Sequence, residues 1–239
     1  MNLQGTQITW LGHGTFSFKT PSGKTFLLDP WTQGNPACPA DKKHVGKLDD
    51  ILITHGHADH IGDAIAVAQE GQPDHVVAIV ELAGWLDSKG VANTMGMNKG
   101  GTVDLGGYKA TMVHADHSCG ITDGNTTVYG GEAVGYILTL ANGPTIYFAG
   151  DTNVFSDMAI YADLYQPQVA ILPIGDYYTM GPREAAYAAK LLRAQTIIPA
   201  HFATFPALTG TPQALREALG SFGLGSVEVV EMQPGQTLA

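Results

Sequence analysis

Residues 52–63 read LITHGHADHIGD, and the last nine positions of this stretch hold three histidines and two aspartates. An extended backbone points every second side chain the same way, so His55 and His57 can converge on one ion. Asp59 and His60 lie beyond the turn and lead into a helix, where they can hold a second ion. Burying five such side chains without a metal would leave too many polar groups unpaired. The stretch therefore predicts part of a metal site.

The remaining metal ligands have to come from other segments, because catalytic zinc uses three or more protein ligands and one segment cannot complete two sites. Histidines and aspartates also stand where other predicted strands end, namely His114, His117, Asp151 and His201. Strand ends on one edge of a sandwich form a shared rim, so these side chains can meet. Alone, Asp151 would suit a turn after a strand. Because other candidate ligands stand at neighbouring strand ends, we interpret Asp151 as a metal ligand.

Short apolar runs, many of them β-branched and bounded by Gly, Pro, Asn or Asp, predict strands. They are 8–12, 16–20, 25–29, 51–54, 76–80, 108–113, 134–140, 145–150, 169–174, 196–200 and 227–232. Segments rich in Ala and Leu at helical spacing predict helices between the strands. They are 62–70, 81–89, 156–164, 182–194 and 212–221. Because strands and helices intermingle along the whole chain, we expect an α/β protein.

Two parts of the chain share one pattern. FSFKTPSGKTFLLDP (16–30) and YILTLANGPTIYFAGDT (136–152) are each a strand, a turn with glycine and a second strand that ends on an aspartate. Each is followed by a stretch that contains a helix and then by another buried strand. Two such halves packed sheet to sheet predict a four-layer αββα sandwich, with two mixed sheets flanked by helices. We expect residues 1–239 to form a single domain.

The composition argues against several classes of protein. The chain carries a net charge of −10 with 12 Lys and Arg, and no basic run is longer than Lys42–Lys43. A nucleic-acid partner would need clustered cations for its phosphates, so none is expected. No stretch approaches the ~20 apolar residues that span a bilayer, and the first residues do not resemble a signal peptide. We expect a cytoplasmic protein with a small-molecule substrate and no membrane partner. Assembly into a homo-oligomer stays open.

Four segments resemble the ligand motifs of the metallo-β-lactamase superfamily. They are T-H-x-H-x-D-H at 54–60, HADHS at 114–118, FAGDT at 148–152 and PAHF at 199–202. The segments WLGHGTF, LLDPW, MNKGG and PIGDYYTMGP further resemble the branch of small metal-dependent hydrolases related to the ascorbate-phosphate lactonases. The resemblance implies the four-layer fold of that superfamily and a hydrolase that depends on metal ions.

The resemblance also implies which residues bind the ions. The ligands of the first ion would be His55, His57 and His117. Those of the second ion would be Asp59, His60 and His201, with Asp151 bridging the two. The third ligand of the first ion is the open choice, between His117 and His114. Because the family's ligand resembles the histidine before Ser118, His117 is preferred, and His114 then lies beside the site or in the pocket.

The implied chemistry is that of a binuclear hydrolase. Two cations about 3.5–4 Å apart hold a bridging hydroxide, which would attack a small ester, lactone or phosphoester. Asp59 would act as a catalytic residue that orients this hydroxide or moves a proton. Nitrogen-rich ligands favour Zn²⁺, with Mn²⁺ or iron as alternatives. A di-iron redox protein and a non-catalytic metal-binding protein are the competing interpretations.

Further residues are predicted to surround the ions or to bind the substrate. Asp29 either accepts the free N–H of a ligand histidine or forms a turn, and His13, in a loop flanked by glycines, can reach the rim. In the loop 94–102, Asn98 and Lys99 can meet a carboxylate or phosphate, and Tyr178 lies in a loop that selects substrates. A solvated Lys99 and a tyrosine packed beneath the helix at 182 fit these positions equally well.

Overall fold

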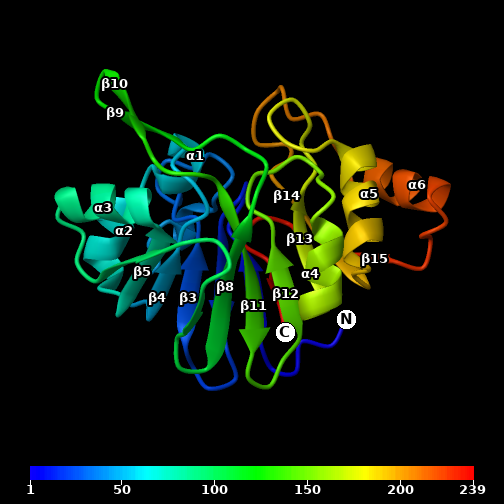
Figure 1. Ribbon diagram of the computed structural model, residues 1–239, viewed down its shortest axis with the longest axis horizontal. Helices are drawn as coiled ribbons and strands as arrows, with labels where there is room; N and C mark the ends of the chain where they lie inside the picture. Colours follow the sequence, from blue (N-terminus) through cyan, green and yellow to red (C-terminus); the bar gives the residue numbers. More distant parts are fainter.

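Two seven-stranded sheets pack face to face, and helices cover their outer faces (Figure 1). The computed structural model describes all 239 residues. Three helices from the first half of the chain lie against one sheet, and three from the second half lie against the other. This order of layers confirms the four-layer αββα sandwich with two mixed sheets.

The first sheet combines the N-terminal part of the chain with its last strand. Its spatial order is β16 (Thr237–Leu238), β1 (Gln7–Trp10), β2 (Phe16–Lys19), β3 (Thr25–Leu28), β4 (Asp50–Leu52), β5 (His75–Ile79) and β6 (Thr94–Met97). Neighbours from β16 to β3 are antiparallel, and neighbours from β3 to β6 are parallel. Strands β1, β3 and β4 therefore run in one direction and end at the same edge.

The second sheet repeats this plan. Its spatial order is β15 (Glu228–Val229), β14 (Thr196–Ala200), β13 (Val169–Pro173), β12 (Thr145–Phe148), β11 (Val134–Leu140), β8 (Tyr108–His114) and β7 (Thr102–Asp104). Both sheets contain a hairpin followed by a parallel strand, β2–β3–β4 in one and β11–β12–β13 in the other. A separate hairpin of β9 (Gly120–Asp123) and β10 (Thr126–Tyr129) projects from the sandwich (Figure 1).

The helices are short and turn one face to a sheet. They are α1 (Ala58–Ile61), α2 (Ala64–Gly71), α3 (Val80–Ser88), α4 (Met158–Tyr165), α5 (Pro182–Leu192) and α6 (Pro212–Ser221), with a 3₁₀ turn at Ala40–Lys42. In α5 a proline occupies the first turn and the buried stripe includes Ala185, Ala189 and Leu192. The five helices predicted from periodicity are all present. None of the helices has the length and apolar character needed to cross a membrane.

A cluster of 42 buried residues fills the space between the sheets and the space beneath the helices of the first sheet. Aromatic rings connect the two layers: Phe26 stacks on Phe18 at 4.8 Å and on Tyr108 of the opposite sheet at 4.1 Å. The hydroxyl of Tyr108 donates to Oδ2 of the buried Asp50 at 3.0 Å, and His75 Nδ1 lies 2.8 Å from Oδ1 of the same carboxylate. This contact joins the sheets at the starts of β4 and β8, at the end of the sandwich opposite the predicted ligands.

The loop expected at residues 94–102 is confined to residues 98–101, and the rest of that prediction is wrong. Thr94–Met97 form β6 beside β5, and β7 begins at Thr102, so the segment crosses from the edge of one sheet to the edge of the other. Gly96 and its neighbouring methionines do not have the β-branched or aromatic character that marks a strand. Such an edge strand depends on pairing with its neighbour, which the local sequence does not reveal.

Removing the hydroxyl of Tyr108 should weaken the contact between the sheets. Tyr108→Phe leaves the buried Asp50 with one hydrogen-bond partner fewer, so we expect the free energy of unfolding to fall by about 1–3 kcal/mol. Tyr187→Phe on the outer face of α5 is the control, because its side chain is 42% exposed. Urea denaturation measures both variants, and an equal loss in the two would contradict the inter-sheet role.

Candidate metal centre

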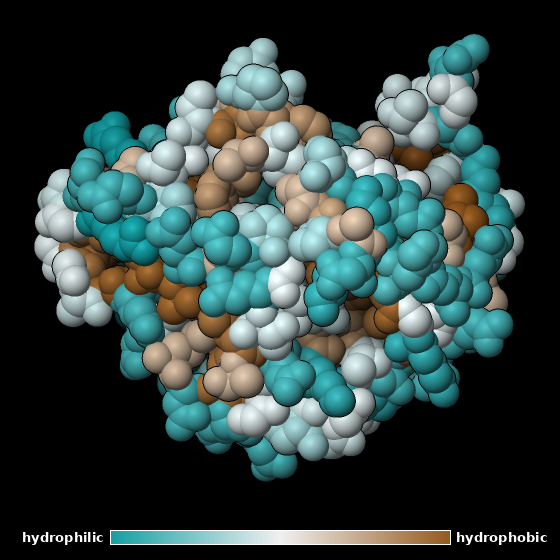
Figure 2. All heavy atoms as spheres, turned by 180° about the vertical axis from the view of Figure 1, so that it is seen from behind, coloured by the Kyte–Doolittle hydropathy of each residue, from teal (hydrophilic) through white to brown (hydrophobic).

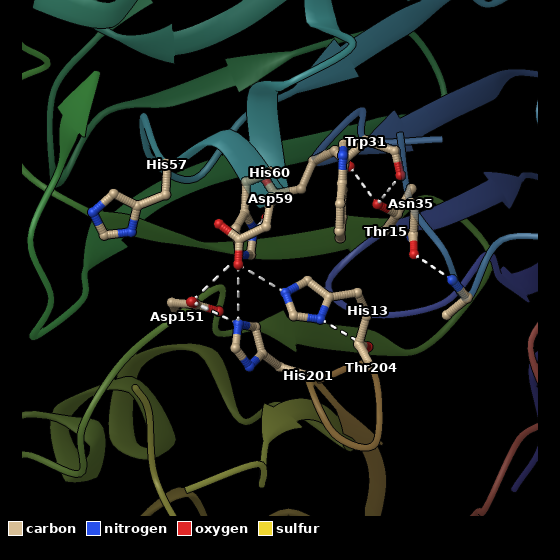
Figure 3. Close-up of polar contacts among 12 residues, drawn as sticks. His13, Thr15, Trp31, Asn35, His57, Asp59, His60, Asp151, His201 and Thr204 are labelled. Carbon is tan, nitrogen blue, oxygen red and sulfur yellow. Dashed lines mark hydrogen bonds and ion pairs between the residues drawn. The ribbon is translucent and has the colours of Figure 1, made fainter. Parts of the chain in front are cut away.

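The predicted ligands lie at one edge of the sandwich, at the top of Figure 1, where strands of both sheets end. On the first sheet, the loop after β4 carries the 55–60 ligand segment, and the loops after β1 and β3 carry His13 and Asp29, which were predicted to lie around the ions. The loops after β8, β12 and β14 carry the predicted ligands of the second sheet: His117, Asp151 and His201. Figure 3 shows side chains from both sheets turned toward one another.

Three imidazole nitrogens converge on one point. Nδ1 of His57 lies 3.0 Å from Nε2 of His55 and 3.3 Å from Nε2 of His117. Two ligands of a tetrahedral zinc ion at about 2.0–2.1 Å from the metal are roughly 3.3–3.4 Å apart. The spacing of the three nitrogens therefore fits a single ion with one further position for another ligand.

A second group lies beside the first. His13, Asp59, His60 and His201 offer atoms that all lie within 4.8 Å of one another. Oδ2 of Asp59 is 2.9 Å from Nε2 of His13 and 3.7 Å from Nε2 of His201. A carboxylate and imidazoles in one buried cluster are suitable ligands for a divalent transition metal.

One oxygen of Asp151 lies between the two groups. Its Oδ2 is 3.0 Å from Nε2 of His201 and 3.3 Å from Nε2 of His60. The same oxygen is 3.7 Å from Nε2 of His117 and 3.9 Å from Nε2 of His55. The side chain of Asp151 is 4% exposed. A carboxylate in this position faces both sets of nitrogens.

The buried histidines also contain atoms without a hydrogen bond. Nε2 of His60 and both ring nitrogens of His201 are buried and unpartnered, although Asp151 is close, because the contact angles do not suit a hydrogen bond. A buried polar atom left in this way is costly unless something else satisfies it. Metal ions among these side chains would satisfy both Nε2 atoms, so the residues present fit the metal that their chemistry implies.

Asp29 supports histidines of both groups. Its Oδ2 lies 2.8 Å from Nδ1 of His60 and accepts a 2.7 Å hydrogen bond from the hydroxyl of Thr54. That hydroxyl oxygen is in turn 3.0 Å from Nδ1 of His55. When Nδ1 of a histidine donates to a carboxylate, its Nε2 lone pair is free for a metal. Sequence reasoning did not single out Thr54, although it opens the T-H-x-H-x-D-H motif.

His13 connects Asp59 to the loop after β14. Its Nδ1 is 2.9 Å from Oγ1 of Thr204 and its Nε2 is 2.9 Å from Asp59, as Figure 3 shows. The backbone carbonyl of His13 accepts a 3.1 Å hydrogen bond from the amide of His201. The fully buried His13 therefore holds two members of the second group in place.

The backbone at this edge is strained. His13 (φ 56°), Asp29 (φ 50°) and His201 (φ 52°) all adopt the left-handed conformation. For residues other than glycine this costs about 1–2 kcal/mol each and persists only where the surroundings enforce it. Gly150 (φ 61°) turns the chain just before Asp151, and a Cβ there would lie 2.8 Å from Thr54. The strain is concentrated in the loops that aim the polar side chains.

Burial and charge divide the histidines into two classes. Burial lowers the pKa of His55, His57 and His117, which favours the neutral imidazole that binds metals. Burial also acts to lower the pKa of His201, but the Asp151 carboxylate outweighs it and raises that pKa to about 9. The pKa of His60 is raised for the same reason. The charge of Asp151 is thus already compensated by histidines of the second group.

Three other predicted residues lie away from these groups. The ring of His114 packs against Phe155 with centroids 5.0 Å apart and belongs to none of the clusters that could hold an ion. Lys99 forms an ion pair with Glu132, and the side chain of Asn98 accepts the amide hydrogen of Lys99. None of the three lines the cavity beside the metal centre.

A cavity of about 840 Å³ opens beside the two groups. Tyr178 lines it, together with Asp59, Asp151, His57 and His117. Sequence reasoning missed its other main lining residues, which are Trp31, Ser118, Phe205, Pro206 and Ala207. These residues lie in loops without periodicity, and the only available signal was their closeness in sequence to Asp29, His117 and His201.

Disrupting the support that Asp29 provides should weaken metal binding without removing a ligand. We expect Asp29→Asn and Thr54→Val to lower the affinity for at least one ion by about 10- to 100-fold, because the histidine rings lose their orientation. Competition with a chromogenic chelator measures this affinity.

The matched control is Asp50→Asn, which changes the other buried Asp–His contact at the opposite end of β4. It should lower stability and leave the metal affinity unchanged. Equal metal affinity in the Asp29, Thr54 and wild-type proteins would contradict the role of this hydrogen-bonded chain.

Known proteins share both the sequence and the fold. A family model described as a beta-lactamase superfamily domain matches residues 24–202. A UPF0173 metal-dependent hydrolase of Koribacter versatilis is 56% identical over 237 residues, which cover 99% of each chain. Another from Solibacter usitatus is 55% identical over 230 residues, or 96% of this chain and 98% of the relative.

Among solved structures, Igni18, a metallo hydrolase from the archaeon Ignicoccus hospitalis, superposes with a TM-score of 0.84. Its sequence identity is 32%, and the match covers 98% of this chain and 97% of that one. These matches confirm the family resemblance of the four ligand motifs. The chain is a metal-dependent hydrolase that belongs to the metallo-β-lactamase superfamily.

Proposed function

We propose that this hydrolase binds two divalent metal ions and uses them to cleave a small ester, lactone or phosphoester with water. The observation that carries the proposal is the position of Asp151, whose Oδ2 faces nitrogens of both groups. A carboxylate shared in this way is suited to two neighbouring ions. Because the ligands come from both sheets, we also propose that residues 1–239 act as a single domain.

The proposed ligands of the first ion are Nε2 of His55, Nδ1 of His57 and Nε2 of His117. Those of the second are Asp59, His60 and His201, with Asp151 bridging. The spacing of the first three nitrogens and the unpartnered Nε2 atoms of His60 and His201 support this division. His13 is close to the second group, but Asp59 and Thr204 already occupy both of its ring nitrogens. We therefore assign His13 to holding Asp59 in position.

We propose Zn²⁺ as the metal, because five of the seven ligands are imidazoles and nitrogen-rich sites favour zinc over iron. Elemental analysis of protein expressed without added metal tests this choice. Mn²⁺ at both positions would change the metal and leave the hydrolase intact. Iron with oxygen-dependent bleaching of an absorption band would favour a di-iron redox protein instead.

Bound together, the ions would supply an activated water molecule and a Lewis acid for the substrate oxygen. Asp59 is the carboxylate best placed to orient that water, because its side chain is 30% exposed and lines the cavity. Burial acts to raise the pKa of Asp59, but the hydrogen bond with His13 and the nearby His201 and His60 outweigh it and lower that pKa. Asp59 therefore stays ionised at neutral pH and accepts hydrogen bonds from water instead of storing a proton.

Replacing proposed ligands should remove metal, whereas replacing other histidines should not. We expect His57→Ala, His117→Ala and Asp151→Ala each to lose at least one equivalent of metal to a mild chelator. His114→Ala and His75→Ala should retain both equivalents, because their side chains lie outside the two groups. Mass spectrometry of metal content checks all five variants. Loss of metal from His114→Ala with full retention by His117→Ala would reverse the choice of third ligand.

Removing the metal should abolish hydrolysis, because the chain would be left without its means of activating water. We expect exhaustive chelation to reduce activity on a panel of esters, lactones and phosphoesters to background, and re-addition of Zn²⁺ to restore it. A protein that holds two ions and hydrolyses nothing in the panel would favour a non-catalytic metal-binding role.

A further inference from the structure

We propose that the part of the substrate that extends away from the scissile bond is uncharged and apolar, so that the enzyme cleaves a neutral ester or lactone. This inference rests on the proposed function and narrows its substrate class. It follows from the walls of the cavity beside the metal centre, which differ in chemistry from its floor.

The floor of the cavity is polar and its walls are aromatic. We call the lining residues that belong to the metal centre the floor, and the apolar lining residues the walls; the floor residues are His57, Asp59, His117 and Asp151. The walls include Trp31 after β3, Tyr178 after β13, and Phe205 with Pro206 and Ala207 after β14. The rings of Trp31 and Phe205 have centroids 6.1 Å apart, so they form one continuous apolar surface. Such walls suit a hydrocarbon group whose polar end reaches the floor.

The cavity offers no cation to a second anionic group. Its eleven lining residues include neither lysine nor arginine, and the carboxylates among them are Asp59 and Asp151. Lys99, the cation that the sequence suggested for this task, pairs with Glu132 outside the cavity. A carboxylate or phosphate on the far part of a substrate would lose water of hydration without gaining a cationic partner. The walls therefore select against such a group.

Exposed aromatic side chains gather at the same place. Of the nine large hydrophobic side chains that are exposed on this chain, Tyr177, Tyr178 and Phe205 lie at or next to the cavity. Tyr177 and Tyr178 are in contact, with ring centroids 4.6 Å apart. Figure 2 shows hydrophobic residues at the upper edge of the molecule, as well as further hydrophobic patches lower on the same face. Apolar surface kept exposed beside a catalytic cavity commonly marks a ligand site.

The proposed reaction is balanced by water alone. The oxygen of water forms a bond to the carbonyl carbon, the bond from that carbon to the leaving oxygen breaks, and the leaving oxygen takes a proton from the water. The products are a carboxylic acid, which releases its proton at neutral pH, and an alcohol. In a lactone both groups stay on one molecule.

Two esters that differ only in charge test the inference. Phenyl butyrate and monophenyl succinate share the scissile bond and the leaving group, and a carboxylate replaces the terminal methyl group in the second. We expect kcat/KM of the zinc-loaded enzyme to be at least about tenfold higher for phenyl butyrate. Equal values, or a preference for monophenyl succinate, would overturn the inference.

Variants of the walls test which residues are responsible. Phe205→Ala should raise KM for phenyl butyrate by about tenfold and leave kcat within about twofold, because a remote apolar contact contributes uniform binding. Ala207→Lys should raise kcat/KM for monophenyl succinate by about fivefold, since it supplies the missing cation. Tyr187→Ala on α5 is the control and should change neither. Wild-type kinetics in both cavity variants would refute the role of these wall residues in selecting the substrate.

A binding measurement separates this inference from the hydrolase function. The ketones 1-phenylpentan-2-one and 4-oxo-5-phenylpentanoate replace the ester oxygen of the two substrates by a methylene group and cannot be hydrolysed. Quenching of tryptophan fluorescence should show at least about tenfold tighter binding of the neutral ketone. Tighter binding of the carboxylate would overturn the inference even in an active enzyme. Preference for the neutral ketone without hydrolysis of any ester, lactone or phosphoester would support the apolar cavity and refute the proposed function.

Discussion

The buried carboxylate of Asp151 is the constraint that organises this edge of the molecule. It stands among Nε2 atoms of four histidines, two from each group, and its side chain is only 4% exposed. A charge buried in this way needs cations or hydrogen-bond donors around it. Asp151 raises the pKa of His60 and His201, which favours the protonated form of both histidines when no ion is bound. Bound metal would replace those protons, so the same carboxylate serves the empty and the loaded centre.

The side chains around Asp151 depend on partners that never touch an ion. Asp29 orients His60 directly and His55 through Thr54, while His13 fixes Asp59 and the backbone of His201. Left-handed backbone at His13, Asp29 and His201 is the energetic cost of these orientations. The buried core between the sheets, with its stacked rings of Phe18, Phe26 and Tyr108, provides stability that offsets this cost.

The sequence predicted the parts of the molecule that have local signals. The sequence indicated the rim through the alternate histidines after a strand and through Asp151, which follows a strand similar to β3. The five predicted helices, α2 to α6, were placed within two residues of their ends. Strand β6 was not predicted, because it depends on pairing with β5 and its own residues carry no strand signal. Lys99 was one candidate for binding the substrate, and its ion pair with Glu132, 33 residues away, could not be foreseen from the local sequence. The aromatic walls were missed because Trp31 and Phe205 lie in loops, where no periodicity reveals which way a side chain faces.

The two ends of the sandwich are fastened by different means. At one end the hydroxyl of Tyr108 reaches Asp50 across the interface, a link that the chain makes with its own atoms. At the other end the ligand side chains come from loops of both sheets, so bound ions would cross-link the two halves. His201 is the last of these ligands along the chain. During synthesis on the ribosome, the cross-link could therefore not be completed until residue 201 had emerged, well after the first half of the chain had become able to fold.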